Sequence, residues 1–389
     1  MASSNKPSLV IIGGGLRYDH QVIFDKIIEL AGGKGAKIAV FPTASRHPYK
    51  VGNYAMNALK KYGADPIFIP LANSNIDVDY QTAVNDPDLI EQVRDCTGIY
   101  FTGGEQHRIT EILLTDQGDR TAMLDAIWQV YERGGVIAGT SAGAAMMSTT
   151  MFTATRSNLE ILKQGVDGTI IGKGLGFIGS DIFIDQHFFK RARFARSIVL
   201  MNTVGYQWGI GVDEDTAIVV QDEQLEVIGY QGVLLMDLSI SSMNHHIHDF
   251  NIKNVKLSYL GKGDLLNLKT MKTTPNELKQ KGAKLMPDSA DYYPYHNKYE
   301  FYPDVLANSI LIDILFNLID NKYRQFIGLA FTHNPDHESD DLGFEFVFRK
   351  GEGTRGYYTG AFGSDDYTII NMYLDVNPIK IQQPLYTKI

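Results

Sequence analysis

Short apolar runs alternate with longer amphipathic segments along residues 1–235. The runs have the length and the β-branched composition of buried strands. They are Leu9–Ile12, Lys37–Phe41, Pro66–Pro70, Gly98–Thr102 and Gly135–Ala138. Most intervals between them carry apolar residues at three-to-four spacing, which is typical of amphipathic helices. Strands that alternate with helices form a parallel sheet covered on both faces, so the pattern predicts an α/β fold with a mostly parallel sheet flanked by helices.

The pattern changes after residue 178, and the composition changes again after residue 270. The strand-like runs of the middle part are Asp181–Asp185, Gly209–Asp213, Ala217–Gln221 and Leu225–Gly229. A tyrosine- and proline-rich stretch, 291–303, then precedes one amphipathic helix at 304–320. Three runs with the character of antiparallel strands follow at Phe344–Phe348, Arg355–Phe362 and Tyr367–Val376. We expect a first domain at residues 1–270 and a small α+β extension at residues 271–389.

Acidic residues outnumber basic ones by 45 to 36, which gives a formal charge of -9. A protein that works mainly by neutralising phosphates is usually basic, so the charge disfavours nucleic acid as a partner. The single cysteine, Cys96, excludes an intrachain disulfide and fits a reducing compartment. We expect it to be an inert, partly buried thiol. No run approaches the roughly 20 apolar residues of a membrane helix, and we predict a cytoplasmic protein.

Several of the predicted strands end in small or polar residues. The segments that follow them are Gly13–Gly15, Pro42–Ser45, Thr102–Gln106 and Gly139–Ser141. Because the carboxyl ends of parallel strands meet at one edge of a sheet, ligands bind there in open α/β folds. We therefore expect these loops to converge on one site.

Ser141 lies in a segment that has the pattern of a nucleophile elbow. Gly139-Thr140-Ser141-Ala142-Gly143 follows a short strand and precedes a good helix start, which fits the G-x-S-x-G strand–turn–helix motif. Glycines permit the tight turn, and the backbone N–H groups at the helix start can bind an oxyanion. The alternative is an ordinary turn of small residues. The strand and helix on either side favour a nucleophilic serine.

A nucleophilic serine needs a base, and the base needs a group that orients it. Among ten histidines, His187 is the best candidate, because it follows a strand-like run and is flanked by Phe188 and Phe189. Three carboxylates, Asp213, Glu214 and Asp215, follow another short strand, and one of them could orient the imidazole. The resulting order is Ser, His, acid, whereas α/β-hydrolases have the order Ser, acid, His.

A cluster of cations follows the histidine. Four positive charges, those of Lys190, Arg191, Arg193 and Arg196, occur within seven residues of an acidic chain. One interpretation is a solvated helix face. The other is a site that recognises carboxylates through the guanidinium groups of arginine.

Four motifs, in this order along the chain, resemble those of cyanophycinases. The motifs are Thr102–Gln106, Gly139–Ala144, Asp185–Arg196 and Gly209–Ala217. Cyanophycinases group with dipeptidase E among serine peptidases built on a glutaminase-like sheet, similar to that of class I glutamine amidotransferases. The resemblance covers roughly residues 8–255. It implies hydrolysis of cyanophycin, a poly-aspartate whose β-carboxylates are amide-linked to arginine, to β-Asp-Arg dipeptides.

The resemblance also implies a role for individual residues. It makes Ser141 the nucleophile, His187 the general base and Glu214 the group that orients it. The backbone N–H groups of Gly104 and Ala142 would form the oxyanion hole. The positions expected to bind substrate are Gln106, Asp185, Gln186, Arg191, Arg193 and Arg196. A serine, histidine and glutamate triad supplies its own base, so we expect no metal or cofactor, and the resemblance suggests a homodimer.

Two rival functions stay open at this stage. One is an aspartyl dipeptidase similar to dipeptidase E, and the other is a non-catalytic protein that binds cyanophycin granules. The run Arg191-x-Arg193-x-x-Arg196 favours the polymer, and the intact serine, histidine and glutamate argue against a binding protein. The resemblance does not extend to residues 271–389, which could form a dimer contact, a polymer-binding surface, a lid or mere structural reinforcement.

Two weaker motifs invite a cofactor or a metal ion. Gly13–Gly15 follows the first strand, but Tyr18 stands where the last glycine of a dinucleotide-binding motif should be, so a tight turn beside the active site is favoured. His245, His246 and His248 could suggest a metal site, but we expect structural or surface roles. A further pair, His333 and His337, is expected in a loop. We therefore predict neither a cofactor nor a metal ion.

Overall fold

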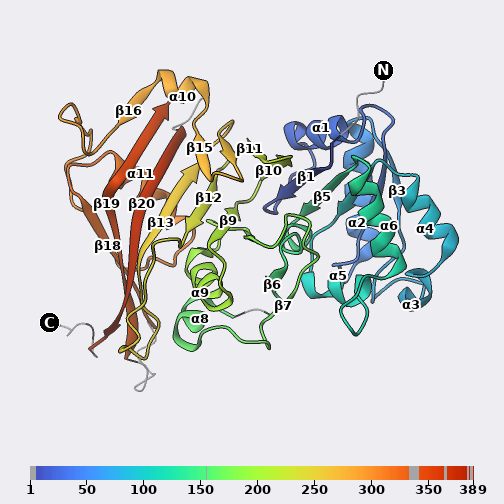
Figure 1. Ribbon diagram of the computed structural model, residues 1–389, viewed down its shortest axis with the longest axis horizontal. Coiled ribbons are helices and arrows are strands. Elements are labelled where there is room, and N and C mark those ends of the chain that lie inside the picture. The colour runs from blue at the N-terminus through green and yellow to red at the C-terminus, as the bar shows by residue number, and fades with distance from the viewer. Residues whose placement is uncertain (1–5, 155, 333–340, 363–365, 383–384, 386–388) are drawn as a thin grey trace.

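The computed structural model describes residues 6–154, 156–332, 341–362, 366–382, 385 and 389. Two large sheets lie side by side in it, the first with the N-terminal helices and the second with the C-terminal strands (Figure 1). β6 (Thr150–Phe152) and β7 (Ile171–Lys173) form a separate, two-stranded antiparallel sheet. No helix of the described part is long and apolar enough to cross a membrane.

The first sheet has a parallel half and an antiparallel half. The parallel strands are β1 (Ser8–Ile12), β2 (Lys37–Phe41), β3 (Asp65–Phe68), β4 (Gly98–Phe101) and β5 (Val136–Thr140). The antiparallel strands are β10 (Thr216–Gln221), β11 (Gln224–Gly229), β14 (Leu265–Asn267) and β15 (Lys272–Thr274). Their order is β15-β14-β11-β10-β1-β5-β4-β2-β3, so β5 and β1 lie near the centre. The predicted strands agree with the observed ones to within about two residues.

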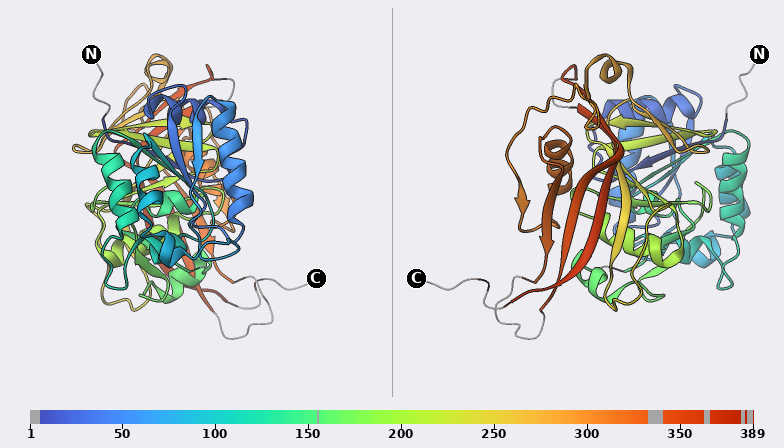
Figure 2. Two further views of the ribbon diagram at one scale, coloured as in Figure 1. Left: turned by 90° about the vertical axis from the view of Figure 1, so that its right-hand side faces the viewer. Right: turned by 60° about the vertical axis from the view of Figure 1, so that its left-hand side comes forward.

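Helices cover both faces of this sheet (Figure 2). One face packs against α1 (Gln21–Leu30) and α2 (Pro48–Lys61). The other face packs against α3 (Tyr80–Ala83), α4 (Pro87–Arg94), α5 (Gln106–Leu113), α6 (Ala122–Glu132) and α7 (Ala142–Ala145). Strand residues alternate between the two cores, since Tyr100 packs with α1 and α2 whereas Phe101 packs on the opposite side. The predicted α/β fold is confirmed.

The second sheet combines middle and C-terminal strands of the chain. Its members are β8 (Ile182–Gln186), β9 (Trp208–Val212), β12 (Val233–Asp237), β13 (Ile252–Leu260), β16 (Ala283–Leu285), β17 (Phe301–Tyr302), β18 (Gln325–Ala330), β19 (Leu342–Thr359) and β20 (Asp366–Lys380). β8 and β9 are parallel, and β13 pairs with β20. Strands from both sides of residue 270 thus share one sheet, and the division into residues 1–270 and 271–389 stays a prediction.

One face of the second sheet packs against a separate hydrophobic core. This core joins α8 (Asn158–Gln164) and α9 (Phe194–Val204) to α11 (Ile310–Ile319) and β19. A short helix, α10 (Glu277–Lys281), packs against β19 and β20.

Two C-terminal elements differ from the sequence-based expectation. The helix expected at 304–320 begins only at Ile310, after Ser309 in a left-handed conformation with φ 62°. The runs 344–348 and 355–362 belong largely to one long strand, β19, because an irregularity in its pairing with β20 absorbs the glycine-containing stretch between Lys350 and Arg355.

Candidate active site

Ser141 lies on a sharp turn between β5 and α7. Its backbone has φ 54° and ψ -109°. This conformation is energetically unfavourable for a residue that has a side chain, and such strained residues are concentrated at functional sites. The flanking glycines make the turn possible. A Cβ atom on Gly139 would lie 2.1 Å from the carbonyl oxygen of Gly143, and one on Gly143 would lie 2.7 Å from that of Phe101. The strand–turn–helix geometry expected of the G-x-S-x-G segment is therefore present.

His187 follows the last residue of β8 and lies beside the serine. Its Nε2 atom is 2.9 Å from Ser141 Oγ, within hydrogen-bond distance. The histidine has φ 48°, and its backbone N–H donates to the carbonyl oxygen of Gly13 at 2.6 Å. Its side chain is only 10% exposed. The end of β8 in the second sheet thus places the His187 imidazole beside Ser141, which follows β5 of the first sheet.

Glu214 is the carboxylate that contacts the imidazole. Its Oε1 atom lies 2.6 Å from His187 Nδ1, so the ring donates from Nδ1 and can accept from the serine at Nε2. The other two candidate acids have different partners. Asp213 accepts the backbone N–H of Lys190 at 3.1 Å, and Asp215 forms an ion pair with Arg17 at 3.0 Å. The structure thus distinguishes three neighbouring carboxylates, which the residue pattern alone left open and of which the resemblance implied Glu214.

The electrostatic surroundings keep the imidazole neutral. Burial lowers the pKa of His187, the hydrogen bond that its ring donates to Glu214 opposes this, and the positive charges of Arg191 and Arg193 lower the pKa further. The net direction is a pKa below the ordinary value of 6.5. A neutral imidazole at neutral pH can take a proton from a serine, as a general base must.

The glycine loop after β1 covers the histidine and the glutamate. A Cβ atom on Gly14, which has φ +107°, would lie 2.4 Å from the His187 ring, and one on Gly15 would lie 3.1 Å from Glu214 Oε2. Asp215 fastens this loop, since it accepts the backbone N–H of Arg17 and donates its own N–H to Gly14, each at 3.0 Å. The loop is a tight turn beside the triad. The sequence analysis considered Asp215 only as a possible partner of His187, because nothing local indicates its contacts with the glycine loop.

The loop between β4 and α5 passes beside the serine. A Cβ atom on Gly103 would lie 3.2 Å from Ser141 Cβ. Gly104 has φ +151°, and a Cβ atom there would lie 2.1 Å from the carbonyl oxygen of Ala44, so only glycine fits. Ala142 is buried at the first position of α7. The two residues expected to form the oxyanion hole thus belong to the two segments that adjoin Ser141.

Asp185, Arg193 and Arg196 form a buried group, which we call the arginine–aspartate cluster. Arg196 donates to both oxygens of Asp185, at 2.8 and 2.7 Å, and Arg193 adds a third contact at 3.2 Å. Burial alone would raise the pKa of Asp185, but the two guanidiniums outweigh it and hold this pKa below its usual value. Lys190 and Arg191 are exposed instead. The cation run thus divides into two exposed and two buried members, and recognition of a substrate carboxylate by them stays a prediction.

The remaining residues expected to bind substrate lie around this cluster. Gln106, at the start of α5, donates from Nε2 to the carbonyl oxygen of Phe152 at 2.6 Å. The Arg196 guanidinium lies over the Phe152 ring, 4.3 Å from its centroid. Gln186 is buried, and its Oε1 has no hydrogen-bond partner among the described residues. Substrate binding by these side chains stays a prediction.

A cavity of about 370 Å³ opens directly beside Ser141 and His187. We call it the tyrosine cavity, because Tyr54 and Tyr100 are among its lining residues. Its volume is in the range of small-molecule binding sites. This cavity therefore gives a ligand access to the serine.

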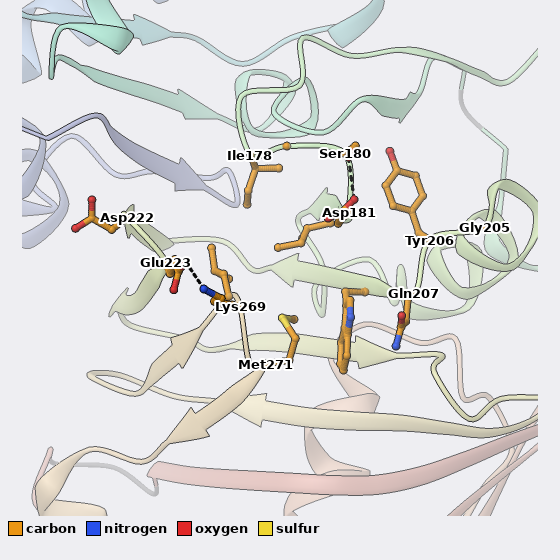
Figure 3. Close-up of a pocket in the computed structure, with 14 residues that line it drawn as sticks. Ile178, Ser180, Asp181, Gly205, Tyr206, Gln207, Asp222, Glu223, Lys269 and Met271 are labelled. Carbon is orange, nitrogen blue, oxygen red and sulfur yellow. Dashed lines mark hydrogen bonds and ion pairs between the residues drawn. The ribbon is translucent and has the colours of Figure 1, made fainter.

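Figure 3 shows the residues around a second cavity, of about 630 Å³. It is lined from the opposite ends of β8 and β9, by residues such as Ile182 and Trp208. Its rim acid Glu223 is paired with Lys269 at 3.6 Å. None of the residues expected to act in catalysis lines it.

The described residues contain no group of three histidine, cysteine or acidic side chains placed to hold a metal ion. The His248 side chain is fully exposed beside Asp249. His333 and His337 lie outside the described residues. Cys96 is completely buried rather than partly buried, and burial raises its pKa to about 11, so the thiol stays protonated and unreactive at neutral pH.

Known proteins with similar sequences place the chain in a family. The sequence profile described as Peptidase family S51 matches residues 9–228. The chain belongs to peptidase family S51. This membership makes it a serine-type peptidase, in agreement with the serine, histidine and glutamate arrangement.

Cyanophycinases are among the relatives of this family member. The cyanophycinase of Geminocystis herdmanii is 34% identical over 273 residues, which are 68% of this chain and 95% of the relative. That of Synechococcus elongatus is 32% identical and covers 69% of this chain and 81% of its own. The crystal structure of a peptidase from an acI-B1 Actinobacterium has a TM-score of 0.50 at 21% identity, covers 68% of this chain and 98% of that one, and supports the fold.

Proposed function

We propose that this S51 peptidase is an exopeptidase that hydrolyses cyanophycin to β-Asp-Arg dipeptides through an acyl-enzyme. One observation carries the proposal, the chain of hydrogen bonds from Ser141 Oγ to His187 at 2.9 Å and from His187 to Glu214 at 2.6 Å. The cyanophycinases that align with about two thirds of the chain support the choice of polymer.

The reaction begins at the serine. His187 accepts the hydroxyl proton at Nε2 while Ser141 Oγ attacks the scissile carbonyl carbon. Glu214 keeps the ring in the tautomer that leaves Nε2 free, and its negative charge stabilises the imidazolium that forms. Backbone N–H groups of Gly104 and Ala142 then donate to the oxyanion of the tetrahedral intermediate.

The imidazolium completes both halves of the reaction. It gives its proton to the leaving amine, the C–N bond breaks, and the acyl group stays on Ser141 as an ester. His187 then takes a proton from water, the hydroxide attacks the ester, and the serine recovers its proton as the acid leaves. The neutral state of His187 at rest, which its lowered pKa supports, is required at the start of each half.

Substrate recognition begins from the charges near the serine. Cyanophycin carries a free carboxylate on each arginyl residue, and the exposed Arg191 next to His187 offers a guanidinium to it. Gln106 and Gln186 add amide groups nearby. In the buried arginine–aspartate cluster, Asp185 fixes the positions of the two guanidiniums.

Replacing the nucleophile tests the proposal. Ser141→Ala should lower kcat on cyanophycin by roughly 10⁴-fold or more, because no oxygen remains to form the ester. Release of β-Asp-Arg from purified polymer is measured by chromatography, and cosedimentation with insoluble cyanophycin shows that the variant still binds. Release at the rate of the unaltered chain would exclude Ser141 as the nucleophile.

The same assay separates the two rival functions. An aspartyl dipeptidase would cleave soluble aspartyl dipeptides faster than the polymer, and a granule-binding protein would sediment with cyanophycin without releasing dipeptide. The glutaminase-like topology, the homodimer, the cytoplasmic location and the C-terminal extension as a separate module remain further parts of the proposal. Sedimentation velocity of the full chain tests the dimer.

A further inference from the structure

The tyrosine cavity and the arginine–aspartate cluster lie on opposite sides of the nucleophile. Tyr100 and Thr102 alternate with Phe101 along the end of β4, and Tyr100 belongs to the core that α1 and α2 cover. Gln106, by contrast, begins α5 on the opposite face of the sheet and reaches toward the cluster through Phe152. A substrate that crosses Ser141 therefore meets two different environments.

The walls of the cavity are largely apolar and aromatic. Leu16 lies after the glycine loop, Val51 and Tyr54 come from α2, and Tyr100 comes from β4. Tyr54 is 49% exposed, and the edge of Tyr18 contacts it with 5.8 Å between ring centroids. Such walls suit a side chain with a long hydrocarbon stem or a flat group that can lie on an aromatic ring.

One polar atom in the lining lacks a partner. Thr102 is 3% exposed, and its Oγ1 has no hydrogen bond among the described residues. A buried hydroxyl without a partner costs free energy, so a ligand that donates a hydrogen bond to it is favoured. A purely hydrocarbon side chain would leave this oxygen unsatisfied.

The distribution of charge disfavours a further guanidinium on the cluster side of the serine. Beyond the serine, the oxygens of Asp185 are occupied by Arg193 and Arg196, and Glu105 is paired with Arg46 and Arg108. Neither Asp185 nor Glu105 is therefore free to pair with a further guanidinium. On the cavity side no acidic residue is among the described lining residues, and Glu214, behind Gly15, is hydrogen-bonded to His187, so the guanidinium there depends on the aromatic ring and on Thr102 Oγ1.

We propose that the tyrosine cavity binds an arginyl side chain of cyanophycin, from one of the two residues that flank the scissile bond. The inference rests on the proposed function and adds a binding site to it. The methylene stem lies against Leu16 and Val51, the guanidinium plane packs on the Tyr54 ring, and one N–H group donates to Thr102 Oγ1. The neighbouring residue of the polymer lies on the side of Arg191.

Side-chain variants of the cavity test the site. Tyr54→Ala should raise KM for cyanophycin about fivefold or more, because it removes the ring that the guanidinium contacts, and Tyr54→Phe should restore most of the affinity. Thr102→Val keeps the shape but loses the hydroxyl, and it should raise KM about threefold. Lys50→Ala changes an exposed residue of the same helix and serves as the control. Equal KM values for Tyr54→Ala and the control would overturn the proposal.

A ligand assay separates this proposal from the proposed function. Agmatine, which is a guanidinium on a short alkyl chain, should bind to the Ser141→Ala protein in calorimetry and lose affinity in Ser141→Ala/Tyr54→Ala. A neutral alkyl amide of the same length should bind more weakly. Equal binding of the two probes, or agmatine binding that Tyr54→Ala does not change, contradicts an arginyl site. Absence of cyanophycin hydrolysis by the unaltered chain, with agmatine still bound, contradicts the proposed function instead.

Discussion

At the scale of single residues, the site depends on a few backbone conformations that side chains rarely adopt. Ser141 and His187 both have positive φ values, and Gly14 approaches the histidine ring so closely that no side chain fits there. These conformations cost about 1–3 kcal/mol each and persist because the surrounding packing enforces them. As a result, the serine, the imidazole and the carboxylate are already in hydrogen-bond contact.

The charge next to the histidine should set the pH dependence of the enzyme. Activity requires neutral His187, so it should rise with pH through the pKa of this residue, which lies below 6.5. Arg191 disfavours the imidazolium, and Arg191→Gln should therefore raise the pKa of His187 and move the acid limb of the pH–rate profile to higher pH. The shift should shrink at high salt, because Arg191 is exposed.

Lys190→Gln is the matched control, since this exposed neighbour carries the same charge and is not among the main causes of the lowered pKa of His187. Profiles of kcat/KM are measured for the three proteins with a soluble substrate. An acid limb that moves equally in both variants would show that net charge, rather than the position of Arg191, is responsible.

At the scale of elements, the catalytic histidine depends on a helix far along the chain. The backbone N–H of Ser309, just before α11, donates to the carbonyl oxygen of Phe189 at 2.8 Å. Phe189 also packs on Tyr259, which in turn contacts Phe316 of α11 at 4.9 Å between ring centroids. The segment after His187 is thus held by α11, which lies outside the part of the chain that matches the family.

Phe316→Ala should lower both stability and turnover. The lost aromatic packing should cost about 2–3 kcal/mol of unfolding free energy, less than for a fully buried phenylalanine. A looser Phe189 segment should also lower kcat more than it raises KM, because the geometry between Ser141 and His187 relaxes. Chemical denaturation and steady-state kinetics measure the two effects, with Asp313→Asn on the exposed side of the helix as control. Unchanged kcat at lowered stability would limit α11 to a structural role.

At the scale of the whole molecule, the C-terminal strands and the earlier part of the chain share one core and one sheet (Figure 1). A buried ion pair also joins them. Lys279 on α10 is fully buried and lies 3.0 Å from Asp264 and 3.1 Å from Asp366. Asp264 also accepts a hydrogen bond from Thr368 on β20 at 2.5 Å. Residues from both sides of position 270 therefore meet at one charged group.

Removing the lysine should show how strongly this junction stabilises the fold. Lys279→Ala leaves two buried carboxylates without their cation and should cost about 3–5 kcal/mol of unfolding free energy. Lys281→Ala on the same helix removes an exposed partner of Glu277 and should cost less than about 1 kcal/mol. Thermal unfolding of the full chain compares them. Similar losses in both variants would contradict a structural role for the buried pair.

The sequence alone determined the local features of this protein. Apolar periodicity gave the parallel strands and their helices, because a buried strand and an amphipathic helix each need a local pattern. The G-x-S-x-G segment marked Ser141, since the turn it forms depends on neighbouring glycines only. His187 was recognisable by its place at a strand end.

Tertiary structure decided what depends on residues that meet only after folding. Glu214 rather than Asp213 or Asp215 contacts His187, because the loop after β9 turns that side chain toward the ring. Arg193 and Arg196 turn inward to Asp185, a pairing that the run of charges does not reveal. The second sheet, which places β8 beside β9 and β20 beside β13, arises from pairings between distant segments. The local sequence does not identify such partners. Only the folded chain therefore shows that its C-terminal part contacts the segment after His187.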